Sequence, residues 1–171
     1  MTSTRLPASA TGVTESLCVA DVLMDRAINL NLQGADGDSV LRELVALVIP
    51  PGQKRPTEML FKALKERENL CSTCVNDGVA VPHSRNAVIG LVDEPVIAYG
   101  RHVAGIEFGA LDGNRVHHFF LLCAPSVRAH LRLLSRLARL LNNPDFRAKL
   151  HHVRTNEELI ALVRDAEQFI C

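Results

Sequence analysis

The stretch RVHHFFLLC, residues 115–123, is apolar almost without interruption after its first residues. A strand with one solvated face alternates polar and apolar residues, whereas a strand covered on both faces reads as a nearly continuous apolar run. Just upstream, Asp112-Gly113 is a strong signal for a hairpin turn. The stretch therefore predicts a central strand of a sheet that carries a layer on each face.

Three further short segments of β-like composition precede this strand, at residues 79–81, 95–99 and 105–108. They are bounded by turn-forming residues, and the Asp-Gly turn would join the last of them to the central strand. The middle of the chain is therefore predicted to be a sheet.

Two helices are predicted before the sheet. Asp38 is the predicted N-cap of the first, in which apolar residues recur every three to four positions until Pro50-Pro51 ends it. Pro56 stands at the predicted first position of the second helix, which continues to about Glu68. Each helix has one apolar face that needs a partner layer.

Three helices are predicted after the sheet. Ser126 is the expected cap of a long helix, Asn143-Pro144 opens a short one, and Thr155-Asn-Glu-Glu158 is a capping box for the last. Helices on both sides of the strands predict an α/β, three-layer domain with a central mixed β-sheet flanked by helices.

Composition suits one ordinary domain, because 47% of the 171 residues are hydrophobic. Residues 1–16 are rich in Ser, Thr and Ala and are expected to form a flexible N-terminal arm, and residues 17–171 a single domain. No apolar run approaches the roughly 18 to 20 residues that span a bilayer, and no stretch resembles a signal peptide. We therefore expect a soluble protein of the cytoplasm.

Charge is balanced, with 19 basic and 19 acidic residues. Nucleic acids and anionic membranes are usually bound through an excess of basic residues. Neither is an expected direct partner, so a partner must be recognised locally.

Five scattered cysteines do not resemble a disulfide framework, and reduced thiols are expected. Cys71-Ser-Thr-Cys74 has the spacing of half a zinc site, but a structural site needs two more ligands and no second cysteine pair exists. A thioredoxin-like redox pair would precede a helix, whereas this pair follows a predicted one. We therefore expect no metal, and no redox chemistry of the thioredoxin kind.

His83 follows the apolar run Gly78-Val-Ala-Val-Pro82, which predicts a short buried strand that ends at this histidine. Functional sites collect at strand ends in α/β folds. A surface histidine without a function is an equally good interpretation from these residues alone.

The motif GVAVPH, residues 78–83, resembles the phosphorylation site of enzyme IIA domains of the phosphotransferase system, type 2, which comprises the fructose, mannitol and nitrogen-regulatory class. The similarity extends over roughly residues 17–166. Other matching segments are Glu66-Arg67-Glu68, Ser72-Thr73, Gly105-Ile-Glu-Phe108, Leu111-Asp-Gly113, Phe119-Phe-Leu-Leu122 and His130-Leu131.

The resemblance implies the enzyme IIA fold and a histidine phosphotransferase function. It assigns the phosphoryl acceptor to His83, a partner histidine to His130 and an active-site arginine to Arg67. Arginine suits this role because its planar guanidinium can hold phosphate oxygens, and phosphoryl transfer depends mainly on positioning and charge stabilisation. The alternative for His130 is a histidine at the edge of the core.

The resemblance also implies the partners. The phosphocarrier HPr, or its nitrogen-branch paralogue, would be the donor, and no cofactor would be needed. Downstream lies either an enzyme IIB, in sugar uptake, or a set of regulated target proteins, and any contact with a membrane would be indirect, through a transporter. The absence of a fused IIB or of transmembrane segments favours a stand-alone regulatory enzyme IIA over a component of sugar uptake.

The sequence departs from the family pattern at a few positions. Ser84-Arg85 follows the acceptor where Gly and then a basic residue are common, and Cys71 and Cys74 occupy positions that are often glycine. The other histidines match no family function and are interpreted as structural or surface residues: His102, His117, His118, His151 and His152.

Overall fold

Four strands form one mixed sheet in the order β1-β3-β4-β2 in the computed structural model, which describes residues 17–170. The predicted arm at residues 1–16 lies outside the described residues. In chain order the elements are α1 (Val19–Val22), β1 (Leu23–Asn29), α2 (Gly37–Val48), α3 (Lys54–Leu70), β2 (Val79–Ala80), β3 (Val96–Ile106), β4 (Val116–Cys123), α4 (Val127–Leu141), α5 (Pro144–Leu150) and α6 (Asn156–Glu167).

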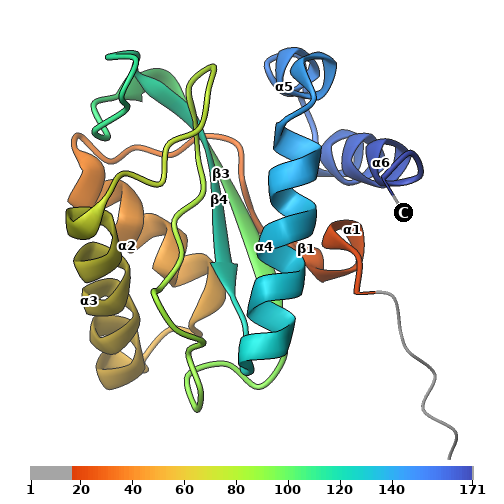
Figure 1. The fold of residues 1–171 in the computed structure, drawn as a ribbon. Coiled ribbons are helices and arrows are strands. Elements are labelled where there is room, and N and C mark those ends of the chain that lie inside the picture. The colour runs from red at the N-terminus through yellow and green to blue at the C-terminus, as the bar shows by residue number, and fades with distance from the viewer. Residues whose placement is uncertain (1–16, 171) are drawn as a thin grey trace, which may run out of the picture.

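Helices cover both faces of this sheet (Figure 1). The pair α2 and α3 lies on one side, and α4, α1 and α6 lie on the other, with α5 at one end of that second layer. Strands β3 and β4 pair antiparallel, while β1 pairs parallel to β3 and β2 parallel to β4. The predicted three-layer α/β fold with a mixed sheet is confirmed.

Strand β4 is the central strand that residues 115–123 predicted. Phe120 and Leu122 belong to the core beneath the C-terminal helices, and Phe119 and Leu121 belong to the core beneath α2 and α3. All four side chains are fully buried. Successive side chains of a strand point to opposite faces, so two buried faces require apolar residues at every position.

One prediction about the strands was wrong, and one strand was missed. The segments 95–99 and 105–108 belong mostly to one long strand, β3, whose pairing with β4 shifts register between Arg101 and Ile106. Strand β1 was not predicted, because the exposed residues Asp25 and Arg26 interrupt its apolar pattern at the edge of the sheet.

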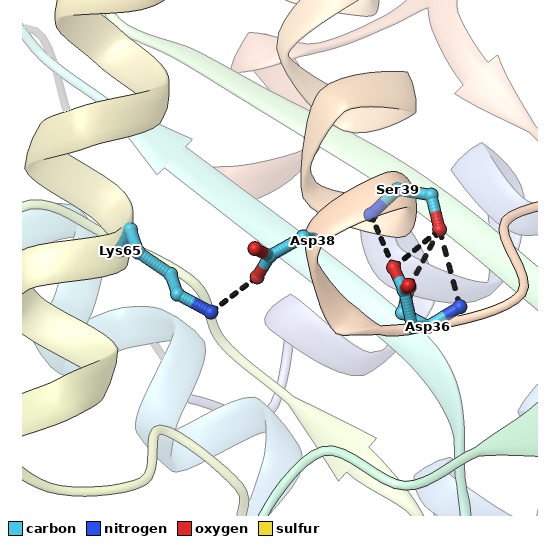
Figure 2. Close-up of polar contacts among 4 residues, drawn as sticks. All are labelled: Asp36, Asp38, Ser39 and Lys65. Carbon is cyan, nitrogen blue, oxygen red and sulfur yellow. Dashed lines mark hydrogen bonds and ion pairs between the residues drawn. The ribbon is translucent and has the colours of Figure 1, made fainter.

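The N-cap of α2 is Asp36 and not Asp38, as Figure 2 shows. The Asp36 carboxylate accepts a hydrogen bond from Ser39 N at 2.8 Å, and Ser39 Oγ accepts one from Asp36 N at 3.1 Å. Asp38 lies in the first turn and forms an ion pair with Lys65 of α3. Both acids precede the same apolar pattern, so sequence spacing could not separate the cap from the first turn. The start of α3 was also placed two residues late, since the helix begins at Lys54.

The predicted caps of the later helices are largely confirmed. Ser126 accepts from Ala129 N in α4, Asn143 accepts from Asp145 N in α5, and Thr155 accepts from Glu158 N in α6. The capping box is only half formed, because the Glu158 carboxylate accepts from Arg154 N instead of Thr155 N. A free backbone amide one residue earlier competes successfully for the same carboxylate.

The buried carboxylate of Glu167 joins the last helix to the first. It accepts hydrogen bonds from Val19 N at 2.6 Å and from Ala20 N at 2.8 Å. Buried backbone N–H groups that lose their partner cost free energy. We therefore expect Glu167→Ala to lower the free energy of unfolding by roughly 1–3 kcal/mol, measured by urea denaturation.

A matched control for this prediction is Asp165→Ala, which removes an exposed carboxylate from the same helix. It is expected to change the free energy of unfolding by less than about 0.5 kcal/mol. Equal effects of the two variants would contradict the role assigned to Glu167.

Candidate functional site

His83 lies where the short strand β2 and the residues after it leave the sheet. Leu122 N of β4 donates a hydrogen bond to Pro82 O at 3.0 Å, and His83 forms an isolated parallel bridge with Leu122. The histidine is therefore held by the central strand while its side chain is only half-buried. The predicted short strand at 79–81 is confirmed at Val79–Ala80.

The tautomer of His83 follows from its backbone contact. Its Nδ1 lies 2.7 Å from Val81 O, and a carbonyl oxygen can only accept, so Nδ1 carries the hydrogen. Burial lowers the pKa of His83, and the charge of Arg67 lowers it further, against the effect of the Val81 carbonyl. The ring is therefore neutral at pH 7 with its lone pair on Nε2, which makes Nε2 the nucleophilic nitrogen.

His130 lies beside His83. It is in the first turn of α4, its ring centroid is 5.7 Å from that of His83, and the planes are tilted by 51°. The side chain is 5% exposed, and its Nδ1 has no hydrogen-bond partner among the described residues. Burial lowers the pKa of His130, and the neighbouring His83 lowers it further. The helix dipole at this end of α4 favours an anion close to both rings.

Arg67 reaches the site from the last turn of α3. Its Nη1 donates a hydrogen bond of 2.7 Å to Cys71 O, which ties the guanidinium to the loop that follows the helix. A guanidinium carries five N–H donors, so one bond to a carbonyl leaves several for phosphate oxygens. The structure thus brings all three sequence-predicted site residues, His83, His130 and Arg67, to one region.

The loop of residues 71–74 supports the acceptor through the backbone. The Glu68 carboxylate accepts from Thr73 N at 2.8 Å and from Thr73 Oγ1 at 2.6 Å. Thr73 O in turn accepts from Val81 N at 3.1 Å, and Val81 O holds the His83 ring. Glu68 and Thr73 lie in segments that match the family, but no role was predicted for them from the sequence. The structure shows that they fix the geometry of the acceptor indirectly.

The two cysteines of this loop have separate environments. Cys71 is exposed, whereas the Cys74 thiol donates to Phe108 O at 3.3 Å and burial raises its pKa. Neither takes part in a disulfide. A raised pKa keeps the Cys74 thiol protonated and therefore weakly reactive.

Four exposed apolar side chains lie beside site residues in the groove or along the chain, and sequence reasoning missed them. Leu70 and Ile89 line a groove of about 620 Å³ together with Arg67. Val127 and Leu131 of α4 are 57% and 59% exposed and flank His130 along the chain. Helical periodicity could have found the last two, since they lie off the buried face of α4. Exposed apolar side chains are typical of interaction sites when they form a contiguous patch.

The described residues contain neither a metal-binding cluster nor a membrane-spanning helix. In residues 17–170, no three His, Cys, Asp or Glu side chains are grouped so that they could hold a metal ion. In the same part of the chain, no helix is long and apolar enough to cross a membrane.

Sequence comparison identifies one family. Residues 21–166 match the family described as the phosphoenolpyruvate-dependent sugar phosphotransferase system, EIIA 2. A fructose-specific EIIABC component of Bacillus subtilis is 28% identical over 152 residues, which are 88% of this chain and 24% of that protein. A nitrogen regulatory protein of Pseudomonas aeruginosa is 31% identical over 140 residues, 81% of this chain and 89% of that protein. The chain thus spans about a quarter of the first relative and most of the second.

Structural comparison agrees. The nitrogen regulatory protein IIA-Ntr of Neisseria meningitidis superimposes with a TM-score of 0.73 at 28% identity, over 85% of this chain and 98% of that one. The mannitol IIA of Escherichia coli superimposes with a TM-score of 0.67 at 18% identity, over 82% and 98% of the two chains. At that lower identity the likeness concerns the fold alone.

Proposed function

The chain belongs to the EIIA 2 family of the phosphoenolpyruvate-dependent sugar phosphotransferase system, and on this premise we propose that it is a phosphohistidine carrier that accepts phosphate on His83. The observation that carries the proposal is the tautomer of His83: its Nδ1 hydrogen is held by Val81 O, which leaves the Nε2 lone pair free. The lowered pKa keeps that lone pair unprotonated at neutral pH.

The proposed step exchanges one N–P bond for another. His83 Nε2 attacks the phosphorus of a phosphohistidine on the donor protein, and the N–P bond of the donor breaks with its electron pair returning to the donor's ring. The hydrogen on His83 Nδ1 stays on that nitrogen, hydrogen-bonded to Val81 O, so the phosphorylated ring carries a positive charge. The donor ring carries a hydrogen on its other nitrogen and therefore leaves as a neutral imidazole. Arg67 and His130 would donate hydrogen bonds to the phosphoryl oxygens, whose charge the N-terminus of α4 also favours.

The donor in this proposal is HPr or its nitrogen-branch paralogue, which would dock on an apolar rim formed by Leu70 and Ile89 of the groove and by Val127 and Leu131 beside His130. A small-molecule donor would not need such a rim, whereas a protein donor does. The proposal places the reaction in the cytoplasm, which accords with the free thiols of Cys71, Cys74 and Cys123.

We propose a regulatory role for the phosphorylated protein, in which the state of His83 controls docking to target proteins. In support, the nitrogen regulatory protein of P. aeruginosa is 31% identical and is covered over 89% of its length. A phosphoryl group adds negative charge to the rim, and such a charge is a common means of switching a docking surface.

Sugar uptake is the second candidate. A fructose-like EIIA component of Escherichia coli is 28% identical and is covered over 90% of its length. In this role His83 would pass its phosphoryl group to a separate enzyme IIB.

The experiment supplies phosphoenolpyruvate, enzyme I and one of the two phosphocarriers, and follows label on the protein that is lost in acid and stable in alkali. We expect about one label per chain, and faster labelling by the nitrogen-branch carrier than by HPr. Rapid passage of the label to an added fructose-type IIB would favour uptake instead. A chain that takes no label from either carrier would overturn the proposed function.

A further inference from the structure

Five of the seven histidines lie outside the proposed phosphoryl site, and all five line one cavity of about 320 Å³. They come from three parts of the chain: His102 from β3, His117 and His118 from β4, and His151 and His152 from the turn that follows α5. Sequence reasoning interpreted each as a separate structural or surface residue. Their convergence is a tertiary feature.

The cavity lies at the opposite end of β4 from His83. His117 and His118 begin this strand, whereas the residue that bridges to His83 is Leu122. Four to five strand residues span about 13 to 17 Å. None of the residues that line the cavity belongs to the proposed phosphoryl site.

A chain of hydrogen bonds orients the histidines. Tyr99 Oη lies 2.7 Å from His118 Nδ1, and His118 Nε2 lies 3.1 Å from His151 Nδ1. Burial raises the pKa of Tyr99, so its hydroxyl stays protonated. The hydroxyl therefore donates a hydrogen bond to His118 Nδ1. The alternative tautomer would leave a buried hydroxyl hydrogen without an acceptor. His118 Nε2–H therefore donates to His151, whose own Nε2–H is left as a donor for a ligand.

His117 is fixed by the irregular part of β3. Its Nδ1 lies 3.1 Å from both His102 O and Val103 O and donates to them. A Cβ at Gly105, where φ is +69°, would lie 2.7 Å from the His117 ring. These contacts hold the ring at the same cavity as the ring of His118, although the two residues are adjacent in β4. The register shift between Arg101 and Ile106 provides the space.

Two arginines complete a cationic lining. Arg101 donates to Leu30 O at 3.3 Å and to Val153 O, which holds its guanidinium in place, and Arg154 is exposed at the rim. No carboxylate belongs to the lining, considering the residues that the structure describes. Asp77, whose charge acts on His151, is engaged by Arg147 at 2.7 Å.

The geometry points to a binding site for a small phosphate-bearing anion in this cavity, formed by Arg101, Arg154 and the donor nitrogens around His151. Imidazole side chains alone could bind either an anion or a metal ion. The two guanidinium groups decide between them, because they attract an anion and repel a metal ion. The volume lies at the small end of the range for ligand pockets. A phosphate monoester with a short organic group has suitable size and charge.

The histidines of the cavity act as neutral donors. Burial lowers the pKa of His118 to about 3, and burial together with the neighbouring His117 and His152 lowers that of His151. His151 Nδ1 already accepts the hydrogen bond from His118 Nε2–H, so a proton added to His151 would break this chain of hydrogen bonds. The positive charge that attracts the anion therefore comes from Arg101 and Arg154.

The test is calorimetric titration of the full chain with inorganic phosphate and with glycerol 3-phosphate at pH 8, where both are mainly dianions. We expect saturable binding that weakens at least tenfold in Arg154→Gln and in His151→Gln. Arg164→Gln removes the same charge from an exposed position on α6 outside the cavity and should leave the affinity unchanged. Thermal unfolding of each variant checks that the fold is retained.

Phosphate could also bind at the proposed phosphoryl site, so the titration is repeated with Arg67→Gln. Retained binding in Arg67→Gln, with loss in Arg154→Gln, supports the cavity whether or not His83 accepts phosphate. The reverse pattern, or no saturable binding of either anion, overturns the inference. Binding of Zn²⁺ without binding of phosphate overturns it as well, in favour of a metal site.

Discussion

Replacing His83 with glutamine is expected to abolish phosphoryl acceptance. Glutamine can still donate an amide hydrogen to Val81 O, the bond that now holds the His83 ring, but it has no nitrogen lone pair that attacks phosphorus. With phosphoenolpyruvate, enzyme I and either phosphocarrier, acid-labile label on the chain should fall to background, and the modified peptide of the unaltered protein should contain residue 83.

The fold of His83→Gln should survive, because the side chain is half-buried and its neighbours Pro82 and Leu122 are held through the backbone. Thermal unfolding close to that of the unaltered protein provides the control. Undiminished labelling of a folded His83→Gln chain would show that another residue is the acceptor. Labelling of neither chain would instead refute the carrier function as a whole.

Replacing Arg67 with glutamine should slow labelling by more than about tenfold, the effect expected from removing one preorganised donor to a developing charge. Glutamine can keep a hydrogen bond to Cys71 O, where Arg67 Nη1 now donates, but it loses the positive charge beside His83. His130→Gln should slow labelling by a similar factor because it removes the ring that faces the acceptor. Both rates are measured under single-turnover conditions with excess phosphorylated donor.

Arg139→Gln is the matched control for Arg67→Gln. Arg139 is also in the last turn of a helix, but it is exposed on α4 and lies outside the proposed site. Its labelling rate should be unchanged. Rates in Arg67→Gln and His130→Gln equal to that of the control would return both residues to a structural role, with His130 as a histidine at the edge of the core.

Much of the fold could be predicted because its signals are local. The apolar residues of β4 predicted a strand with two buried faces, and Ser126 and Asn143 predicted the starts of α4 and α5. Strand β1 was missed because it lies at the edge of the sheet, where charged residues are tolerated. Its alternation of polar and apolar residues was therefore too weak to recognise. The cap of α2 was misplaced because Asp36 and Asp38 are chemically equivalent and only the backbone conformation separates them.

The proposed phosphoryl site was predicted as three residues through a family resemblance. Only the tertiary structure revealed the distances between these residues and the tautomer of His83. It also revealed the support that Glu68 gives the acceptor through Thr73. The apolar rim and the histidine cavity gave no sequence signal as units, since each combines residues from separate elements.

By itself, the sequence determined the three layers of helices and sheet in this protein. Burial of one or both faces imposes a regular spacing of apolar residues on each strand and helix, and that spacing can be read from neighbouring residues. It also determined that His83 follows a buried strand. Only the tertiary structure decided which nitrogen of His83 is free and which histidines meet. Both depend on contacts between residues far apart in the chain, such as His118 with His151, and no local periodicity records such contacts.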